Sequence, residues 1–155
     1  MKTSRRCSRE SVVRAGTLVD RANRDPIPVL FRKEPAMAEC CGGGPKLIFS
    51  CSGAADVGAI ADQAARKLNA AGKGKMYCMA GIGGRVSGII KTTEGAAKIV
   101  AIDGCPLNCA KNSLEQAGFT TFEHVKLVEL GMEKGKSPVS DDKVAKVVAK
   151  CEEVL

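Results

Sequence analysis

Residues 98–109, KIVAIDGCPLNC, decide how the rest of the chain is interpreted. The run KIVAID has the length and apolar content of a buried strand, and a glycine and two cysteines follow it directly. Similar apolar runs occur at 46–50 (KLIFS), 75–80 (KMYCMA) and 122–130 (FEHVKLVEL). Helical patterns separate or follow them, at 55–72, 81–97, 105–118 and 140–155.

Strict alternation of strands and helices is typical of a parallel sheet covered on both faces. The sequence therefore predicts an α/β fold, an open parallel sheet of Rossmann or flavodoxin type with about four strands and helices on both faces. In the segment 81–97, a glycine-rich turn is expected to lead into a short helix that turns Val86, Ile89 and Ile90 inward. The order of the strands cannot be read from the sequence.

The composition sets broad limits on what the protein does. A chain of 155 residues with 45 % hydrophobic content can form one domain with a real core. Aromatic residues make up 3 % and tryptophan is absent, which disfavours nucleic-acid modules that stack bases. No apolar run is long enough to cross a bilayer or to act as a secretory signal. We therefore expect a cytoplasmic protein that does not bind membranes.

The net charge of +7 is concentrated near the amino terminus, because residues 1–36 carry nine Lys/Arg against four Asp/Glu. The remainder carries fifteen against thirteen. We expect residues 1–36 to be a disordered extension, or the product of an over-extended reading frame that truly starts at Met37. Residues 37–45 would be a flexible lead-in, and 46–155 the metal-binding domain. A basic arm for nucleic acid or lipid headgroups is the alternative, less favoured because aromatic residues do not interleave with the arginines.

Four cysteines form the main functional signal. Cys51, Cys78 and Cys105 are separated by two gaps of 26 residues, and Cys109 follows after three more. Each of the first three comes at or near a strand end, so the sulfurs are expected at one edge of the sheet, with Cys105 and Cys109 on one face of a helix start. Thiolates at this spacing favour Zn²⁺, and helix N-termini are expected to lower the thiol pKa values.

Several polar residues are candidates to support a charged thiolate site. The cations that could offset its negative charge, or bind an anion, are Arg85, Lys111, Lys134 and Lys136. Asp103 and Asn108 adjoin the cysteine pair and could orient a thiolate, and Asp103 could also act as a base toward metal-bound water. Structural alternatives stay open: solvated surface charges for the cations, and capping of the next helix for Asp103.

The remaining cysteines and motifs carry less weight. Cys151 falls in the apolar stripe of the last helix and is expected in the core. Cys40 and Cys41 are possible accessory thiols, and Cys7 lies in the basic extension. The stretch GIGGRV at 81–86 lacks the third glycine of a dinucleotide fingerprint. Its glycines could hold an oxyanion together with Arg85, although a tight turn is the simpler reading. His124, the single histidine, is expected to be structural or exposed.

The sequence resembles the DGC family, small zinc-binding proteins named for the Asp-Gly-Cys tripeptide that occurs here at 103–105. The stretches FSCSGAADVG, CMAGIGG, DGCPLNC and ELGMEKGK carry the resemblance across residues 46–155. It implies a metal site made by the same four cysteines, Cys51, Cys78, Cys105 and Cys109, and a bacterial or archaeal setting, but no substrate.

These observations predict a small protein that holds one zinc ion through four cysteines at the carboxyl edge of the sheet. The alternatives are a thiol- or metal-dependent enzyme or redox protein acting on heavy metals or sulfur compounds, and an iron-sulfur cluster carrier. Its partner would be a small molecule or a protein. The sequence leaves the substrate open, and also whether the metal is structural or catalytic.

Overall fold

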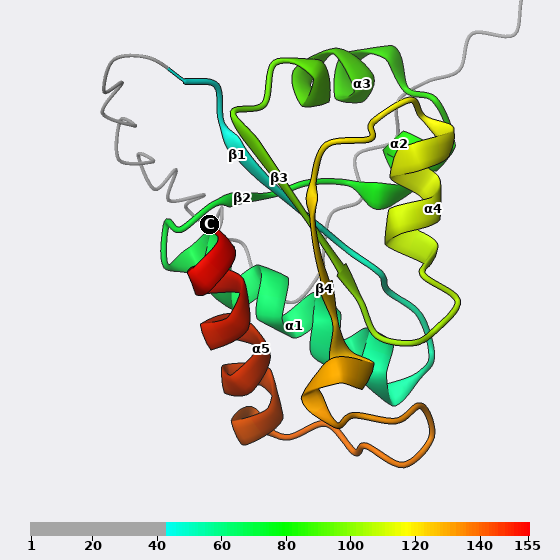
Figure 1. The fold of residues 1–155 in the computed structure, drawn as a ribbon, viewed down its shortest axis with the longest axis vertical. Helices are drawn as coiled ribbons and strands as arrows, with labels where there is room; N and C mark the ends of the chain where they lie inside the picture. The colour runs from blue at the N-terminus through cyan, green and yellow to red at the C-terminus, as the bar shows by residue number, and fades with distance from the viewer. Residues whose placement is uncertain (1–42) are drawn as a thin grey trace, which may run out of the picture. The chain divides into compact units, whose positions relative to one another are not determined.

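The computed structural model describes residues 43–155, so the expectations for the extension at 1–36, for Met37 and for Cys7, Cys40 and Cys41 lie outside the described residues. Within this range, a parallel four-stranded sheet has the order β2-β1-β3-β4 (Figure 1). The strands are β1 (Lys46–Ser50), β2 (Lys75–Met76), β3 (Lys98–Asp103) and β4 (Glu123–Lys126). The predicted open parallel α/β fold is confirmed.

The helices lie on both faces of this sheet. They are α1 (Asp56–Ala70), α2 (Met79–Gly83), α3 (Ser87–Glu94), α4 (Cys109–Gln116) and α5 (Asp141–Val154), and a short 3-10 helix, η1 (Leu127–Leu130), follows β4. On one face, α1 and α5 cover a core that includes Ile48, Val100 and Ile102 of the sheet. On the other, Ile82 of α2 and Leu114 of α4 pack with strand residues of opposite parity.

The central strands form because each is a continuous apolar run, as expected for strands buried on both faces. All but the first residue of β1 is buried, and in β3 five of six are. Helix α1 follows from small and apolar residues at helical spacing, and it ends where Gly72 adopts a φ of 70°. Helix α5 lies within the helical pattern expected at 140–155, and Ser140 precedes it without a capping hydrogen bond from its side chain.

The second strand region differs from the expectation. Only Lys75–Met76 is extended, and the predicted glycine-rich turn is instead the short helix α2. Val86, expected to face inward, is 50 % exposed at the start of α3, whereas Ile89 and Ile90 pack partly against the core. The predicted fourth strand is also shorter, because η1 replaces its second half.

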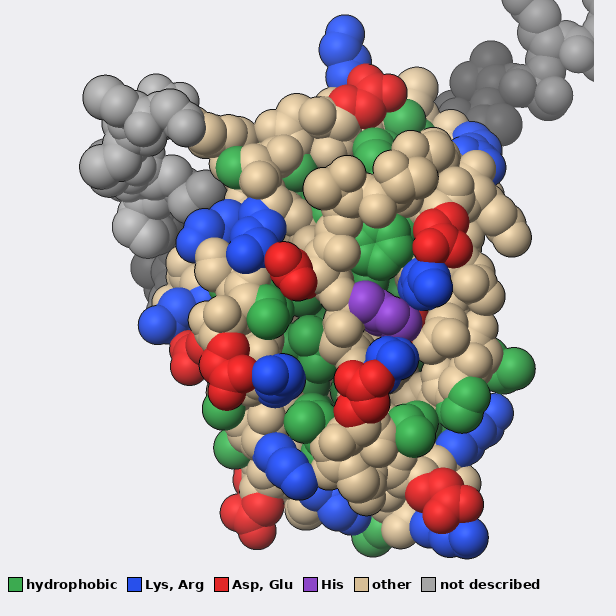
Figure 2. All heavy atoms as spheres, in the orientation of Figure 1, with side chains coloured by type: hydrophobic (Ala, Val, Ile, Leu, Met, Phe, Trp, Pro, Cys, Tyr) green, Lys and Arg blue, Asp and Glu red, His purple; other side chains and the backbone are tan. Residues whose placement is uncertain are grey.

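Charged side chains of both signs are interspersed over the face drawn in Figure 2. This mixture agrees with the small charge surplus of the folded region and shows no single-sign patch on that face. In the part of the chain that the structure covers, no helix combines the length and the apolar character needed to cross a bilayer.

Candidate functional site: a thiol pocket at the carboxyl edge of the sheet

A hollow of about 480 Å³ lies beside the carboxyl ends of β1 and β3. We call it the thiol pocket, because three cysteines line it: Cys51, Cys105 and Cys109. Its other lining residues are Ser52, Gly53, Ala54, Ala55, Val57, Gly58, Gly104, Leu107 and Lys134. Ligand sites of open α/β sheets are usual at this edge.

Cys51 is the first residue after β1, and two hydrogen bonds connect it to β3 and the turn that follows. Its backbone N–H donates to the Ile102 carbonyl at 2.8 Å, and its Sγ accepts the Gly104 N–H at 3.0 Å. Burial raises the pKa of the Cys51 thiol to about 11, the Gly104 hydrogen bond opposes the rise, and negative charge on Asp103, Cys105 and Cys109 adds to it. The expected lowering of this thiol pKa by a helix N-terminus is therefore wrong.

Gly104 of the DGC tripeptide permits a close approach between β3 and α1. A Cβ placed on Gly104 would lie 2.7 Å from the Val57 carbonyl oxygen and 3.1 Å from the Gly58 nitrogen. These atoms belong to the first turn of α1, so the backbone itself would have to move. The glycine thus brings the turn that carries Cys105 against the helix that follows Cys51.

Asp103 fixes the start of α4. Its side chain is 1 % exposed, and its carboxylate accepts hydrogen bonds from the backbone N–H groups of Ala110 (2.8 Å) and Lys111 (3.0 Å). The ring nitrogen Nε2 of His124 lies 2.9 Å from the same carboxylate. The capping alternative for Asp103 is what the structure contains, since it satisfies N–H groups that the helix leaves free.

The contact between His124 and Asp103 was not predicted from the sequence. Its neighbour across the sheet is Ala101, two residues before Asp103, because β4 pairs in parallel with β3. Alternation along β4 marks His124 as facing away from the buried Val125. Only the strand order, which the sequence does not give, identifies Asp103 as its partner.

Cys105 and Cys109 do not share a helix face. Helix α4 begins at Cys109, and Cys105 lies in the preceding turn, so the expected placement of both thiols on one helix start is wrong. Asn108 connects them in a left-handed conformation with φ of 50°, and its Oδ1 is buried without a hydrogen-bond partner among the described residues. Both thiols still line the same pocket.

Cys78 is placed apart from the other three. It precedes α2 as its N-cap residue, is exposed, and does not line the thiol pocket. Across residues 43–155, no three His, Cys, Asp or Glu side chains are grouped so that they could hold a metal ion as they lie. The pocket thus presents suitable donor chemistry in an open arrangement, not a closed set of four ligands.

The candidate cations have different environments. Lys134 lines the thiol pocket. Lys111 lies 3.7 Å from Glu115 and Lys136 2.9 Å from Glu133, and Arg85, at a φ of 55°, donates to the Gln116 carbonyl. Of these four residues, Lys134 is the one that lines the pocket.

Cys151 is fully buried in the core between the sheet and α5, as predicted. Burial raises the pKa of its thiol to about 12. It takes no part in the pocket, which makes it a useful control for the pocket cysteines.

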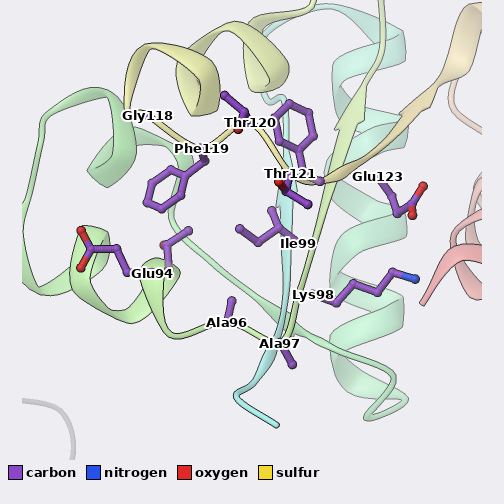
Figure 3. Close-up of a pocket in the computed structure, with 12 residues that line it drawn as sticks. Glu94, Ala96, Ala97, Lys98, Ile99, Gly118, Phe119, Thr120, Thr121 and Glu123 are labelled. Carbon is purple, nitrogen blue, oxygen red and sulfur yellow. The ribbon is translucent and has the colours of Figure 1, made fainter.

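A larger hollow, of about 650 Å³, lies elsewhere (Figure 3). It is bounded by the end of α3, the start of β3 and the loop from α4 to β4, with Phe119, Thr121 and Ile99 around it. No cysteine lines it, and it lies where β3 and β4 begin, not where they end. We therefore assign the candidate function to the smaller thiol pocket.

Comparison with known proteins identifies the family of this chain. The profile of the DGC domain family matches residues 47–151, so this chain belongs to that family. It is similar to the anaerobic and virulence modulator AnvM of Pseudomonas aeruginosa, with 35 % identity over 88 residues that cover 57 % of this chain and 67 % of AnvM. No solved structure matches the chain.

Proposed function

We propose that the protein binds a thiophilic metal ion, zinc in the first instance, through Cys51, Cys105 and Cys109, with Cys78 as the fourth ligand. The observation that supports this is that three thiols line one pocket: those of Cys51 after β1, Cys105 after β3 and Cys109 at the start of α4. A bound zinc ion would hold the thiolates together and stabilise the fold around them. Because the name of the Pseudomonas relative describes a modulator, we favour a sensing role.

Binding requires two changes at the pocket. The Cys51 thiol, whose pKa is raised to about 11, must lose its proton when it becomes a ligand. Cys78, which lies outside the pocket lining, must move toward it with the start of α2. Cys78 is the proposed ligand with the least support from the fold, because it lies between the two-residue strand β2 and the five-residue helix α2.

Elemental analysis of untagged protein purified without added metal tests the proposal. We expect about one equivalent of zinc in the wild-type protein and strong loss in Cys105→Ala. The matched control, Cys151→Ala, removes a buried thiol that is not in the pocket and should keep its zinc. Equal zinc content in the two variants, or none in the wild type, would contradict the proposal.

The open arrangement supports a second candidate, a protein that performs thiol chemistry. The exposed thiol of Cys109 lies on the pocket with two other thiols, and nearby cysteines of this kind can exchange disulfides or bind heavy-metal ions. A colourless, metal-free protein whose pocket thiols react rapidly with a disulfide reagent would favour this function. A brown protein would indicate the third option, an iron-sulfur cluster.

A further inference from the structure

The thiol pocket has an asymmetric charge. Lys134 is the one charged side chain among its lining residues, and no Asp or Glu lines it. Three polarisable thiols therefore face a cavity whose lining carries a single positive charge. A lysine here attracts anions toward the sulfurs, and the attraction is strongest within about 10 Å, the screening length at moderate salt.

The loop that carries Lys134 is held against the pocket. The Asp56 carboxylate, in the first turn of α1, accepts the backbone N–H of Gly135 and that of Ser137, each at 2.8 Å. The Ser137 hydroxyl in turn accepts the Glu133 N–H at 2.9 Å. These bonds flank Lys134 on both sides, so its backbone position follows that of α1, which borders the thiols.

The neighbouring lysine of the same loop provides a contrast. Lys136 forms an ion pair with Glu133 at 2.9 Å and does not line the pocket. Lys134 has no ion-pair partner among residues 43–155. Its charge is thus available to a ligand in the cavity, whereas the charge of Lys136 is locally balanced.

From this geometry we propose that the thiol pocket selects small anionic sulfur compounds, with Lys134 as the residue that recognises the negative charge. The ligand combines an anionic group with a sulfur that thiols attack. In the exchange step, a pocket thiolate attacks the ligand's sulfenyl sulfur, a new S–S bond forms, and the former partner of that sulfur leaves as an anion. This selection concerns the metal-free pocket and does not rest on zinc binding.

Two reagents with the same reactive group and opposite charge test the proposal: sulfonatoethyl and trimethylammonioethyl methanethiosulfonate. Each transfers its thioalkyl group to a thiolate and releases methanesulfinate. The rate at Cys109 is followed by peptide mass spectrometry on metal-free full-length protein, and the anionic-to-cationic rate ratio is divided by that for a small free thiol. We expect a normalised ratio above one that falls roughly threefold to tenfold in Lys134→Gln.

Lys136→Gln is the matched control, since it removes an equal charge two residues away and should change the ratio much less. Raising the salt from about 50 mM to about 500 mM should reduce the wild-type preference as screening increases. Equal effects of the two lysine variants, or a wild-type ratio no higher than that of the free thiol, would overturn the proposal. Either result would leave the zinc measurement unaffected.

Discussion

Cys51, Cys78 and Cys105 are separated by equal gaps of 26 residues, yet the turn after β2, which carries Cys78, and the turn after β3, which carries Cys105, have different surroundings. After β3, a buried carboxylate, a glycine without room for a side chain and a hydrogen bond to Cys51 Sγ hold the turn. After β2, the strand is two residues long and Cys78 is exposed. Equal spacing along the sequence therefore does not give the two cysteines equally well-supported positions. We call the turn after β3 the rigid half of the site and the region of β2 and Cys78 the loose half.

The largest effect on stability is expected from Asp103→Ala, which removes the hydrogen bonds that hold the turn after β3. It leaves the Ala110 and Lys111 N–H groups and the His124 ring without their common acceptor. The free energy of unfolding should fall by about 3 kcal/mol, measured by urea denaturation. Asp142→Ala, at an exposed position in the first turn of α5, serves as the control and should lower stability by less than about 1 kcal/mol. Similar losses in both variants would show that the Asp103 network is not special.

A somewhat smaller effect is expected from Gly104→Ala. The added methyl group would collide with the Val57 carbonyl, and displacement of the first turn of α1 should cost about 2 kcal/mol. Gly53→Ala is the matched control on the same pocket, because a Cβ there meets no atom within 4 Å. Thermal unfolding of both variants checks the difference, and equal melting temperatures would refute the close approach.

Alkaline pH should lower the free energy of unfolding because of the buried Cys51 thiol, which contacts the turn after β3. The folded thiol keeps its proton up to a pKa of about 11, whereas the unfolded thiol loses it near 9.0, so the unfolded state binds fewer protons between these values. Stability should therefore fall as pH rises, by about 1 kcal/mol at roughly pH 10.

Metal-free Cys51→Ala should lose this part of the pH dependence, while Cys78→Ala, at an exposed position, should retain it. The buried Cys151 thiol contributes the same pH dependence of stability to the wild type and to both variants, so it does not affect the comparison. Unfolding measured from about pH 8 to about pH 10 provides the test. Parallel curves for the two alanine variants would count against the buried Cys51 thiol.

The smallest effect on stability is expected in the loose half. Cys78→Ser should change the free energy of unfolding of the metal-free protein by no more than about 0.5 kcal/mol, because the side chain is exposed. Its zinc affinity should nevertheless fall, since the variant removes the proposed fourth ligand. A variant with unchanged zinc affinity would contradict the assignment of Cys78 as a ligand and would leave only the three thiols of the pocket as candidates among the described residues.

The sequence was sufficient where structure is local or uniformly apolar. Strands β1 and β3 are continuous buried runs, and α1 and α5 have clear apolar stripes that include Cys151. Prediction failed at α2, whose glycines favour a turn by propensity. There, a Cβ on Gly81 would meet the Ile89 side chain, so the glycine fits the close packing of α2 against α3.

Three of the four cysteines singled out from the sequence line one pocket and the fourth, Cys78, does not, whereas most contacts that support the pocket were not predictable. A cysteine at a strand end can be read from the sequence, and Cys51 and Cys105 are such residues. The contact between His124 and Asp103, and the bonds from Asp56 to the loop at 135–137, join segments far apart in the chain. They depend on strand order and loop path, which no local pattern encodes.

The bonds of Asp56 also have a consequence for how the protein is made. They join this residue to amides 79 and 81 positions later in the chain. During synthesis on the ribosome, the thiols at positions 51, 105 and 109 emerge before the loop at 133–137 that borders their cavity. A nascent chain would therefore expose these three thiols before Lys134, which lines the same pocket, has been added.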